Sequence, residues 1–274
     1  MGGGLFDRLR GANRRRIARR RLARAPESTP FGFRFNGLAA MQEGRFEPVE
    51  TDLVRRLLER TDRFVNVGAN TGYYCCFAQL AGVPTVALEP VPVNAEMLIA
   101  NMRANGWGEH ITLLPVAAGE TPGFAEIYGV GTGSSLLPGW AGNPQSLAHT
   151  VPLVRLDDVV APPAEGELLL VLMDVEGYEY FALRGARALL AAAPKPLWLV
   201  EIAAAGAGSA ASAHVAETFA LMAESGYAAA AVREGFDPVT EPVPGVTNYL
   251  FHDRRSPLAS ILPEGPRSQG EGAL

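Results

Sequence analysis

The chain has 274 residues, of which 48% are hydrophobic and 19% are charged, and its formal net charge is −5. This length and composition fit one large domain with a substantial core, and the acidic balance gives no reason to expect a nucleic-acid partner. No apolar run reaches the roughly 18 residues of a membrane span, and the N-terminus lacks the apolar segment of a secretory signal.

The first part of the chain is cationic, because Arg8 to Arg24 reads "RLRGANRRRIARRRLAR". We interpret residues 1–30 as a basic, flexible N-terminal extension, with peripheral contact to an anionic membrane surface as the alternative. Residues 31–63 are expected to form a helical lead-in or lid ahead of the main domain. The next feature, the adjacent pair Cys75 and Cys76, cannot form a disulfide framework, which favours a reducing, cytoplasmic setting.

Strands and helices alternate in the first half of the chain. Such alternation is typical of βαβ units and a parallel sheet with right-handed crossovers. In chain order the pattern predicts a helix at 51–60 capped by Thr51 or Asp52, a strand at 64–67, a helix at 72–80, a strand at 84–89, a helix at 94–106 capped by Asn94, and a strand beginning at Ile111 and including "PVAAG".

The second half is less regular until residue 167. The apolar run of the strand at 167–177 is too continuous for a half-exposed strand, so we expect a central position covered on both faces. The predicted elements are a strand at 123–130, a glycine-rich loop at 131–139, an extended piece at 150–160, the strand at 167–177, a helix at 178–192, a strand at 197–202, a loop at 203–212, a helix at 214–226, an antiparallel pair at 228–234 and 247–253, and a disordered tail at 254–274.

Polar and glycine residues gather where the predicted parallel strands end. In an open parallel sheet, ligands bind in the crevice beyond the carboxyl ends of the strands. The residues at these ends are Gly68, Ala69, Asn70, Thr71 and Gly72 after the first strand, Glu89 after the second, Ala117 and Ala118 after the third, Asp174 and Glu176 after the fourth, and Glu201 after the fifth.

The spacing of these residues favours an adenosine derivative as the ligand. Glu89 lies 21 residues after Gly68, about the separation at which a carboxylate reaches the ribose hydroxyls in nucleotide-binding α/β folds. The turn "GANTG" lacks the third glycine of a dinucleotide motif and suits a smaller ligand without phosphates. S-adenosylmethionine meets this description.

Several segments together resemble the FkbM-type S-adenosylmethionine-dependent methyltransferases. They are "FVNVGANTGYY", "VALEPVPVNAEMLIANMRANG", "GTGSSL", "VRLDDVV", "VLMDVEGYEYFALRGARALL", "WLVEI" and "NYLF", and the similarity covers about residues 45–253. The resemblance implies a class I methyltransferase, an α/β Rossmann-like fold with a mostly parallel seven-stranded sheet, one antiparallel strand and helices on both faces. It also implies that residues 64–253 form the cofactor-binding domain and that the methyl group goes to a hydroxyl of a sugar, glycan or glycolipid, or polyketide-type product.

The chain departs from the family pattern at two positions. Asn66 stands where the family usually has Asp, and Leu172 stands where it usually has Lys. Asn66 can hydrogen-bond but cannot balance a charge, so either cofactor affinity falls or Glu47 or Glu50 of "FEPVET" takes over the role. These departures keep open a protein that binds S-adenosylmethionine with little or no catalysis. A NAD-binding oxidoreductase is the further alternative.

We expect Asp174 to act as the base or to orient the acceptor hydroxyl, followed by Glu201 and Glu176, with His149 as an alternative base. No metal ligand is assigned, and a divalent cation held by Asp174, Glu176 and Glu201 is the less favoured alternative. The acceptor pocket should be shaped by residues 124–150 and the N-terminal helix, and the sequence favours no oligomeric state. The expected cofactor-binding residues are Asn66, Gly68, Asn70, Thr71, Gly72, Tyr73, Glu89, Ala117 and Asp174.

Overall fold

The computed structural model describes residue 13 and residues 16–17, 20–203, 214–256 and 258–262. Three of the predicted features therefore lie wholly or partly outside the described residues. They are the basic extension at 1–30, the loop at 203–212 and the tail at 254–274.

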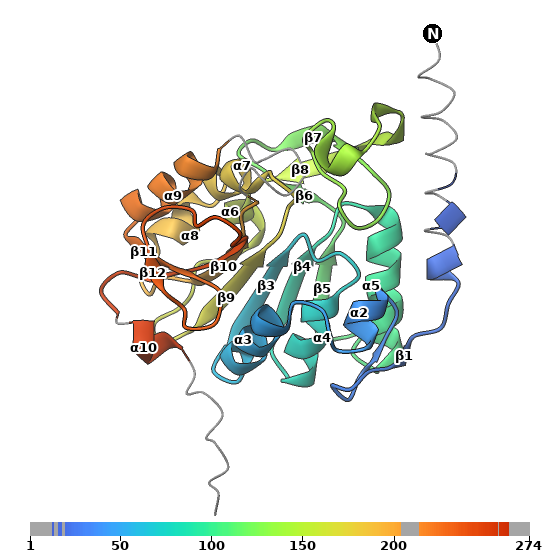
Figure 1. Ribbon diagram of the computed structural model, residues 1–274, viewed down its shortest axis with the longest axis horizontal. Coiled ribbons are helices and arrows are strands. Elements are labelled where there is room, and N and C mark those ends of the chain that lie inside the picture. The colour runs from blue at the N-terminus through green and yellow to red at the C-terminus, as the bar shows by residue number, and fades with distance from the viewer. Residues whose placement is uncertain (1–12, 14–15, 18–19, 204–213, 257, 263–274) are drawn as a thin grey trace, which may run out of the picture.

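A central sheet of eight strands runs through the described part of the chain (Figure 1). Five neighbouring strands are parallel, and β13 is antiparallel to both of its neighbours. The predicted fold class is therefore confirmed, and the two-residue β12 adds an eighth strand at one edge. In spatial order the strands are β12 (Pro238–Val239), β11 (Tyr227–Ala231), β13 (Asn248–Asp253), β10 (Leu197–Glu201), β9 (Leu169–Met173), β3 (Arg63–Val67), β4 (Thr85–Leu88) and β5 (Ile111–Leu114).

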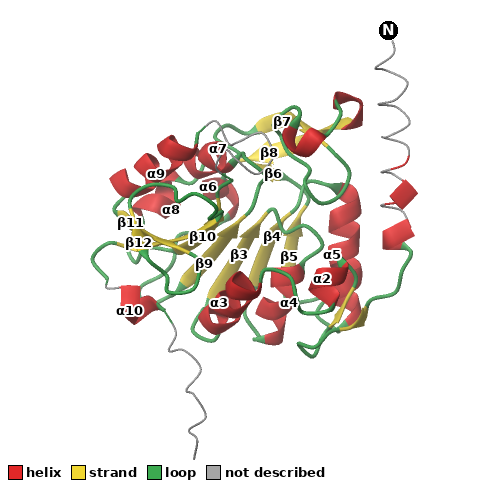
Figure 2. Cartoon of the chain, in the orientation of Figure 1, coloured by secondary structure: helices red, strands yellow, loops and turns green. Residues whose placement is uncertain are grey.

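Helices cover both faces of this sheet, so the strands shown in yellow in Figure 2 form the middle of three layers. Each face has its own apolar cluster, as expected for a sheet whose central strands are apolar on both sides. One face is covered by α2 (Ala39–Gln42), α3 (Pro48–Leu58), α4 (Tyr73–Leu80) and α5 (Pro92–Ala104), with Leu258 of α10 (Leu258–Ile261) packed at its edge; the other is covered by α6 (Leu156–Val159), α7 (Glu179–Arg184), α8 (Arg187–Ala191) and α9 (Val215–Glu224).

A second sheet of three strands lies above the carboxyl ends of the first. It consists of β6 (Ala117–Ala118), β8 (Ala148–Val154) and β7 (Gly123–Tyr128) in that order, with the short helices η1 (Trp140–Gly142) and η2 (Gln145–Leu147) between β7 and β8. The sequence predicted one strand from Ile111 through "PVAAG", and this is wrong. Pro115 has no N–H to donate to the ladder, so β5 stops at Leu114 and Ala117 begins a strand of the other sheet.

Helix boundaries also differ from the prediction at two capping residues. Helix α3 begins at Pro48, so Thr51 is not its cap, and its hydroxyl donates to the Phe46 carbonyl at 2.9 Å instead. Helix α5 begins at Pro92, and the Asn94 side chain donates to Glu89 at 3.3 Å rather than capping. Proline at the first helical position explains both starts, because its fixed φ suits a helix that needs no N–H there.

Three further elements lie where the sequence predicted something else. The helix predicted at 178–192 is divided at Gly185, where a Cβ would lie 2.0 Å from the Gly119 carbonyl oxygen. A small hairpin pairs β1 (Glu27–Ser28) with β2 (Arg34–Phe35), within segments expected to be extension and helical lead-in. Helix α10 falls inside the predicted tail.

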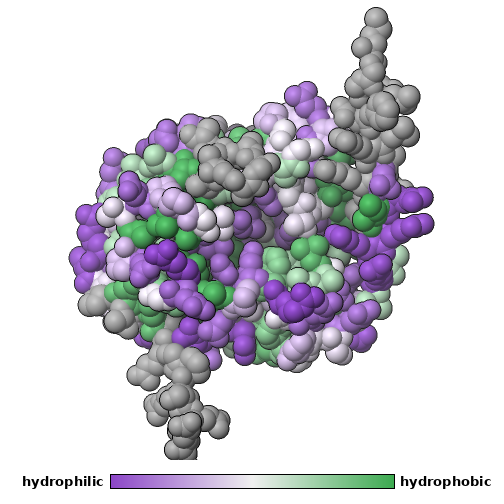
Figure 3. All heavy atoms as spheres, in the orientation of Figure 1, coloured by the Kyte–Doolittle hydropathy of each residue, from purple (hydrophilic) through white to green (hydrophobic). Residues whose placement is uncertain are grey.

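Among the described residues, no helix is both long and apolar enough to cross a membrane. On the face shown in Figure 3, hydrophilic and hydrophobic residues form small interspersed groups, and several hydrophobic groups lie where Figure 1 places α9, β11 and β12. The surface therefore mixes both classes of residue on this side of the molecule.

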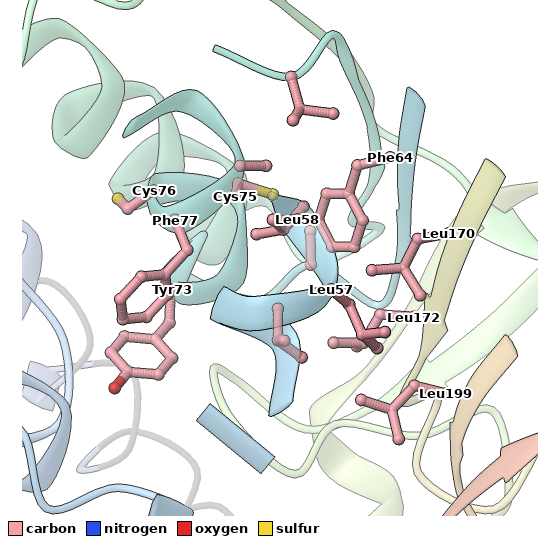
Figure 4. Close-up of a cluster of buried hydrophobic side chains, with 14 of the residues drawn as sticks. Leu57, Leu58, Phe64, Tyr73, Cys75, Cys76, Phe77, Leu170, Leu172 and Leu199 are labelled. Carbon is pink, nitrogen blue, oxygen red and sulfur yellow. The ribbon is translucent and has the colours of Figure 1, made fainter. Parts of the chain in front are cut away.

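Apolar side chains of the sheet, α3 and α4 pack together in one core cluster. In Figure 4, Leu170 and Leu172 of β9 and Leu199 of β10 point from the sheet towards α3, and Leu57 of α3 points back towards them. Cys75 and Cys76 are free and buried in this cluster, as predicted for small thiols.

The two departures from the family pattern are neighbours in this core. Asn66 of β3 and Leu172 of β9 are paired in register across two parallel strands, so their side chains point to the same face of the sheet. Asn66 is 2% exposed and Leu172 is 6% exposed. The amide nitrogen of Asn66 lies 3.5 Å from the Cys75 sulfur, and its Oδ1 has no hydrogen-bond partner among the described residues. This chain therefore lacks both a carboxylate and an ammonium at one buried contact.

This pairing predicts a strong coupling between the two positions. Asn66→Asp should lower the free energy of unfolding by about 3 kcal/mol at pH 8, because it buries a carboxylate without a cation. In the double variant Asn66→Asp, Leu172→Lys, the loss should be at least about 1 kcal/mol smaller than the sum of the two single losses. Urea denaturation of the four proteins measures this coupling.

Thr112→Asp is the matched control, because Thr112 is exposed on the edge strand β5 and the substitution adds the same charge there. Its effect on unfolding should be within about 0.5 kcal/mol of zero. Strict additivity of the single losses would contradict the proposed contact between positions 66 and 172.

Candidate functional site

A pocket opens at the carboxyl ends of β3, β4 and β9, under the second sheet. It contains about 550 Å³ of empty space that is open to solvent. The turn after β3 contributes Gly68 and Asn70, the end of β4 contributes Glu89, and the end of β9 contributes Asp174 and Glu176. The residues that the sequence placed at three different strand ends therefore meet in one pocket.

Backbone contact fixes the floor of the pocket. Gly68 has φ +84°, and a Cβ at this position would lie 1.8 Å from the Asp174 carbonyl oxygen. The Asp174 N–H donates to the Val67 carbonyl at 3.0 Å. Only glycine permits this approach, which brings the turn after β3 directly against the carboxylate-bearing end of β9.

Glu89 holds the turns on either side of it. Its carboxylate accepts the Asn70 N–H at 2.7 Å and the Val91 N–H at 2.8 Å, and it is 4% exposed. Burial raises its pKa to about 7, and the two backbone donors and Asn94 limit the rise. Asn70 has φ +50°, so Glu89 also stabilises a backbone conformation that few residues adopt.

The opposite wall of the pocket is apolar. Val91, Ala117 and Ile127 belong to one buried cluster and line the pocket, and Leu136 packs against them. Ala117 and Ile127 come from β6 and β7, so the second sheet supplies this wall. A flat heterocycle could lie against it while its polar edge faces Glu89.

Carboxylates from separate elements gather beside the pocket. A hydrogen bond joins the side chains of Asp174 and Glu201, and the charges of Glu47 and Glu176 act on both residues. Glu47 accepts a hydrogen bond from the Tyr74 hydroxyl at 2.7 Å. These groups come from β9, β10 and the start of α3, which meet only in the folded chain.

Burial is the main reason that the pKa values of these acids are raised. It raises the pKa of Asp174 well above its usual range, with Glu201, Glu176, Glu179 and Glu47 adding to the rise. Burial and the neighbouring acids raise the pKa of Glu201 to about 8. Burial raises the pKa of Glu179 to about 7, although three backbone N–H groups oppose it. Close carboxylates in a low dielectric cannot all be ionised.

No cation balances this cluster within the described part of the chain. None of the ion pairs between described residues includes Glu47, Asp174, Glu176, Glu179 or Glu201. One oxygen of Glu179, which is 1% exposed, has no hydrogen-bond partner among the described residues. Among those residues, no three His, Cys, Asp or Glu side chains are placed to hold a metal ion.

Trp140 fixes the orientation of Glu176. Its indole N–H donates to the Glu176 carboxylate at 2.6 Å, and its ring covers Gly177, where a Cβ would lie 2.4 Å away. Ser135 donates to the Glu176 carbonyl at 2.6 Å. Glu176 itself has φ +55°, so the loop at 131–139 holds a strained residue in place.

The structure separates the predicted site residues into three groups. Gly68, Asn70, Glu89, Ala117, Asp174 and Glu176 line the pocket. Glu201 does not line the pocket but shares a hydrogen bond with Asp174, and Thr71 lines a neighbouring cavity. The remaining four, Asn66, Gly72, Tyr73 and His149, are not among the described residues that line the pocket.

Those four have other surroundings. Asn66 contacts Cys75, Gly72 packs against Leu98, and Tyr73 is buried among the rings of Phe31, Phe35, Phe46, Tyr74 and Phe77. His149 is paired with Ile127 across β8 and β7, and its Nε2 is buried without a partner among the described residues. Their roles in binding or catalysis stay predictions.

Sequence reasoning missed Trp140, Tyr74 as a partner of Glu47, and Glu179. Trp140 lies in an irregular segment 36 residues before Glu176, so no periodicity connects the two. Glu179 follows the "DVEG" turn and reads as an ordinary first-turn acid of a helix. A lone tryptophan directly after a glycine-rich loop is the signal that could have identified the first contact.

The family model described as the methyltransferase FkbM domain matches residues 66–229. A search of curated proteins gave no match. Among solved structures, a methyltransferase FkbM from Methylobacillus flagellatus is similar at 16% identity, covering 70% of this chain and 44% of that one with a TM-score of 0.45. This chain therefore spans less than half of that relative.

Two other solved structures are also similar. Magnesium protoporphyrin IX methyltransferase from Synechocystis, with bound S-adenosylmethionine, shows 10% identity over 86% of this chain and 90% of that one, with a TM-score of 0.43. A S-adenosylmethionine-dependent O-methyltransferase from Thermotoga maritima shows 12% identity over 74% of this chain and 64% of that one, with a TM-score of 0.41.

The raised pKa values predict that stability falls as pH rises. The pKa of Glu201 is about 8 in the folded protein and 4.5 in the unfolded chain. Protonated Glu201 therefore stabilises the folded protein fully below pH 4.5, and this contribution is lost as the pH rises towards 8. The loss should be on the order of 2 kcal/mol for this residue. Thermal unfolding between pH 5 and 8.5 measures it.

Glu201→Gln removes the titration, so its unfolding temperature should depend less on pH than that of the unaltered protein. Glu96→Gln, at an exposed position of α5, should leave the pH dependence unchanged. An equal slope in all three proteins would show that Glu201 is not buried in its protonated form.

Proposed function

Because the chain belongs to the FkbM methyltransferase family, as the match over residues 66–229 shows, we propose that it transfers the methyl group of S-adenosylmethionine to a hydroxyl oxygen. The proposed acceptor is a sugar, a glycan or glycolipid, or a polyketide-type product. The observation that carries the proposal is the presence of Glu89 and Asp174 in the walls of one pocket. One carboxylate can receive a ribose, and the other stands beside the reacting groups.

The pocket fits the cofactor by the chemistry of its walls. Glu89 uses two of its acceptor positions on backbone N–H groups and a third on the Asn94 side chain, which leaves about one for a ribose hydroxyl. The apolar wall at Val91, Ala117 and Ile127 suits adenine. The turn at Gly68 and the carboxylate of Asp174 would hold the amino acid end and the positive charge. When bound, the cofactor supplies an activated methyl group.

The Asp174 and Glu201 pair is suited to accept the proton of the acceptor hydroxyl. The two carboxyls share a hydrogen bond, and with a pKa of about 8 Glu201 is a stronger base than an exposed glutamate. The acceptor O–H would donate to a carboxylate oxygen of this pair, which would align the hydroxyl and take its proton. Glu176 is held by Trp140 and serves to position the loop.

The binding-only alternative loses part of its basis. It rested on Asn66 and Leu172, which are paired in register on neighbouring strands of the core and do not line the pocket. An uncharged pair there leaves the pocket carboxylates in place. The NAD-binding alternative receives no support from the family assignment.

The function is tested by incubating the purified chain with methyl-labelled S-adenosylmethionine and a panel of methyl glycosides, glycolipids and macrolide alcohols. Mass spectrometry should detect an acceptor that gains one methyl group on oxygen. Binding of S-adenosylmethionine without transfer to any member would favour the binding-only alternative. Binding of NAD in place of S-adenosylmethionine by calorimetry would overturn the proposal.

Two substitutions should separate cofactor binding from turnover. Glu89→Ala should weaken S-adenosylmethionine binding by about a hundredfold, because it removes the ribose acceptor and releases the N–H groups of Asn70 and Val91. Asp174→Asn should weaken binding by no more than about tenfold, because Glu201 still faces the positive charge, and should reduce turnover at least a hundredfold. Calorimetry and single-turnover assays give the two quantities.

Glu96→Ala, exposed on α5, is the control and should change neither quantity. If Glu89→Ala and Asp174→Asn lowered binding and turnover to the same extent, the division of roles between the two carboxylates would be wrong.

Cofactor binding should also depend on pH. A positively charged sulfonium beside Asp174 and Glu201 favours their ionised forms, so binding of S-adenosylmethionine should strengthen at least tenfold from pH 6 to pH 8.5 and release protons. S-adenosylhomocysteine lacks this charge and should show a smaller change. Calorimetry in buffers of different ionisation enthalpy counts the protons, and equal release for both ligands would refute the placement of the charge.

A further inference from the structure

A second cavity lies next to the cofactor pocket, on the side of α2 and α5 (Figure 1). It contains about 820 Å³ of empty space that is open to solvent. Five parts of the chain line it: Ile17 and Arg21 near the N-terminus, Gly37 and Leu38 of the lead-in, Thr71 after β3, the first turns of α5 from Val93 to Met97, and the region from Val130 to Asn143. The region from Val130 to Asn143 lies within residues 124–150, which the sequence analysis expected to shape the acceptor pocket.

Only a short piece of backbone separates the two cavities. Asn94, Gly131 and Gly133 line both of them. The hydroxyl of Thr132 donates to the Asn70 side chain at 3.4 Å, and Asn143 donates to the Gly133 carbonyl at 2.6 Å. The partition is therefore residues 131–133, fixed to the cofactor turn on one side and to the cavity wall on the other.

Gly133 is the point where the second cavity reaches the carboxylates. Its φ is +78°, and a Cβ there would lie 3.9 Å from the Glu176 carboxylate and 3.8 Å from Ala141. Because glycine places no side chain in this gap, a small group extending from the second cavity would meet the carboxylate side of the cofactor pocket here.

The lining of the second cavity differs in charge from that of the cofactor pocket. Of the described residues that line it, Arg21 is the single charged one, and its guanidinium forms no ion pair with another described residue. Leu38, Val93 and Met97 are apolar, whereas Thr71 and Asn94 are neutral and polar. The cofactor pocket, in contrast, holds three acids.

One polar atom of this lining has spare hydrogen-bonding capacity. Asn94 is 4% exposed, and its amide nitrogen is used by Glu89. Its Oδ1 accepts no hydrogen bond from the described residues and would lie 3.8 Å from a Cβ at Gly131. It is therefore available to a hydroxyl donor at the boundary of the two cavities.

We propose that this second cavity binds the methyl acceptor, and that the acceptor is a neutral or anionic amphiphile in which a hydroxyl-bearing ring is joined to an apolar chain. This inference rests on the proposed function. The apolar chain would lie along Leu38, Val93 and Met97, and the ring would face Asn94 and Gly133. Arg21 favours an anionic group over a cationic one at the open end.

The test measures binding of n-octyl β-D-glucopyranoside below its micellar concentration, in the presence of S-adenosylhomocysteine, by calorimetry. Octyl phosphate, octyltrimethylammonium and glucose are the comparison probes. The octyl glucoside and octyl phosphate should bind saturably, and octyltrimethylammonium and glucose should bind at least about tenfold more weakly. No saturable binding of the octyl glucoside, or equal binding of the ammonium probe, would overturn the proposal.

Two variants locate the binding. Leu38→Trp fills the cavity and should weaken the octyl glucoside at least about tenfold while S-adenosylmethionine binding stays within about twofold. Arg21→Glu should weaken octyl phosphate and leave the octyl glucoside unchanged. Leu80→Trp is the matched control, because Leu80 is 49% exposed on α4 and does not line the cavity.

The outcomes also separate this inference from the proposed function. If the octyl glucoside binds and Leu38→Trp abolishes this binding, the second cavity is a binding site for such an amphiphile even if no hydroxyl is methylated. If a hydroxyl acceptor is methylated equally by the unaltered protein and by Leu38→Trp, methyl transfer stands and the site assignment is wrong.

Discussion

The contact on which the site depends is the backbone approach between Gly68 and Asp174. The two turns are close enough that a single Cβ would reach the Asp174 carbonyl. The hydrogen bond from the Asp174 N–H to Val67 continues the pairing of β3 with β9 past the last ladder residue. As a result, the turn after β3 and the end of β9 that carries the carboxylates form one rigid unit. Any residue other than glycine at position 68 would force them apart.

The carboxylates next to this contact repel one another when they are ionised, and no cation among the described residues offsets this repulsion. Glu47, Asp174 and Glu201 face one another, and no described cation pairs with them. In the free protein, protonation of the cluster lowers this repulsion, because neutral acids carry no charge and can share hydrogen bonds. When a positively charged ligand binds, its charge stabilises the ionised carboxylates, and the protons are released. The same arrangement would disfavour a product that has lost the charge, so the cluster favours binding before transfer and release after it.

The sequence predicted the architecture well because its signals were local. The apolar run of β9, the alternation of strand and helix, and the glycines after β3 each act within about ten residues, and all three are present in the structure. Glu89, Asp174 and Glu176 followed from strand ends, whose convergence is a property of parallel sheets. Trp140 and Tyr74 were missed as partners of carboxylates because those contacts cross between elements with no shared period.

Asn66 shows why a departure from a family pattern must be considered together with its neighbours in space. Read along the chain, Asn66 and Leu172 are separate losses of a charge, and each suggests a weakened enzyme. In the sheet the two residues are neighbours, and both are buried and paired in register. A buried ion pair often contributes little net stability, because desolvation offsets the attraction, whereas removing one partner alone is costly. Loss of both charges together is therefore the change that leaves the fold intact. Asp174 and Glu201, the carboxylates proposed to act in catalysis, keep the hydrogen bond between them. The uncharged pair is thus an alternative way of packing this part of the core and gives no evidence of an inactive protein.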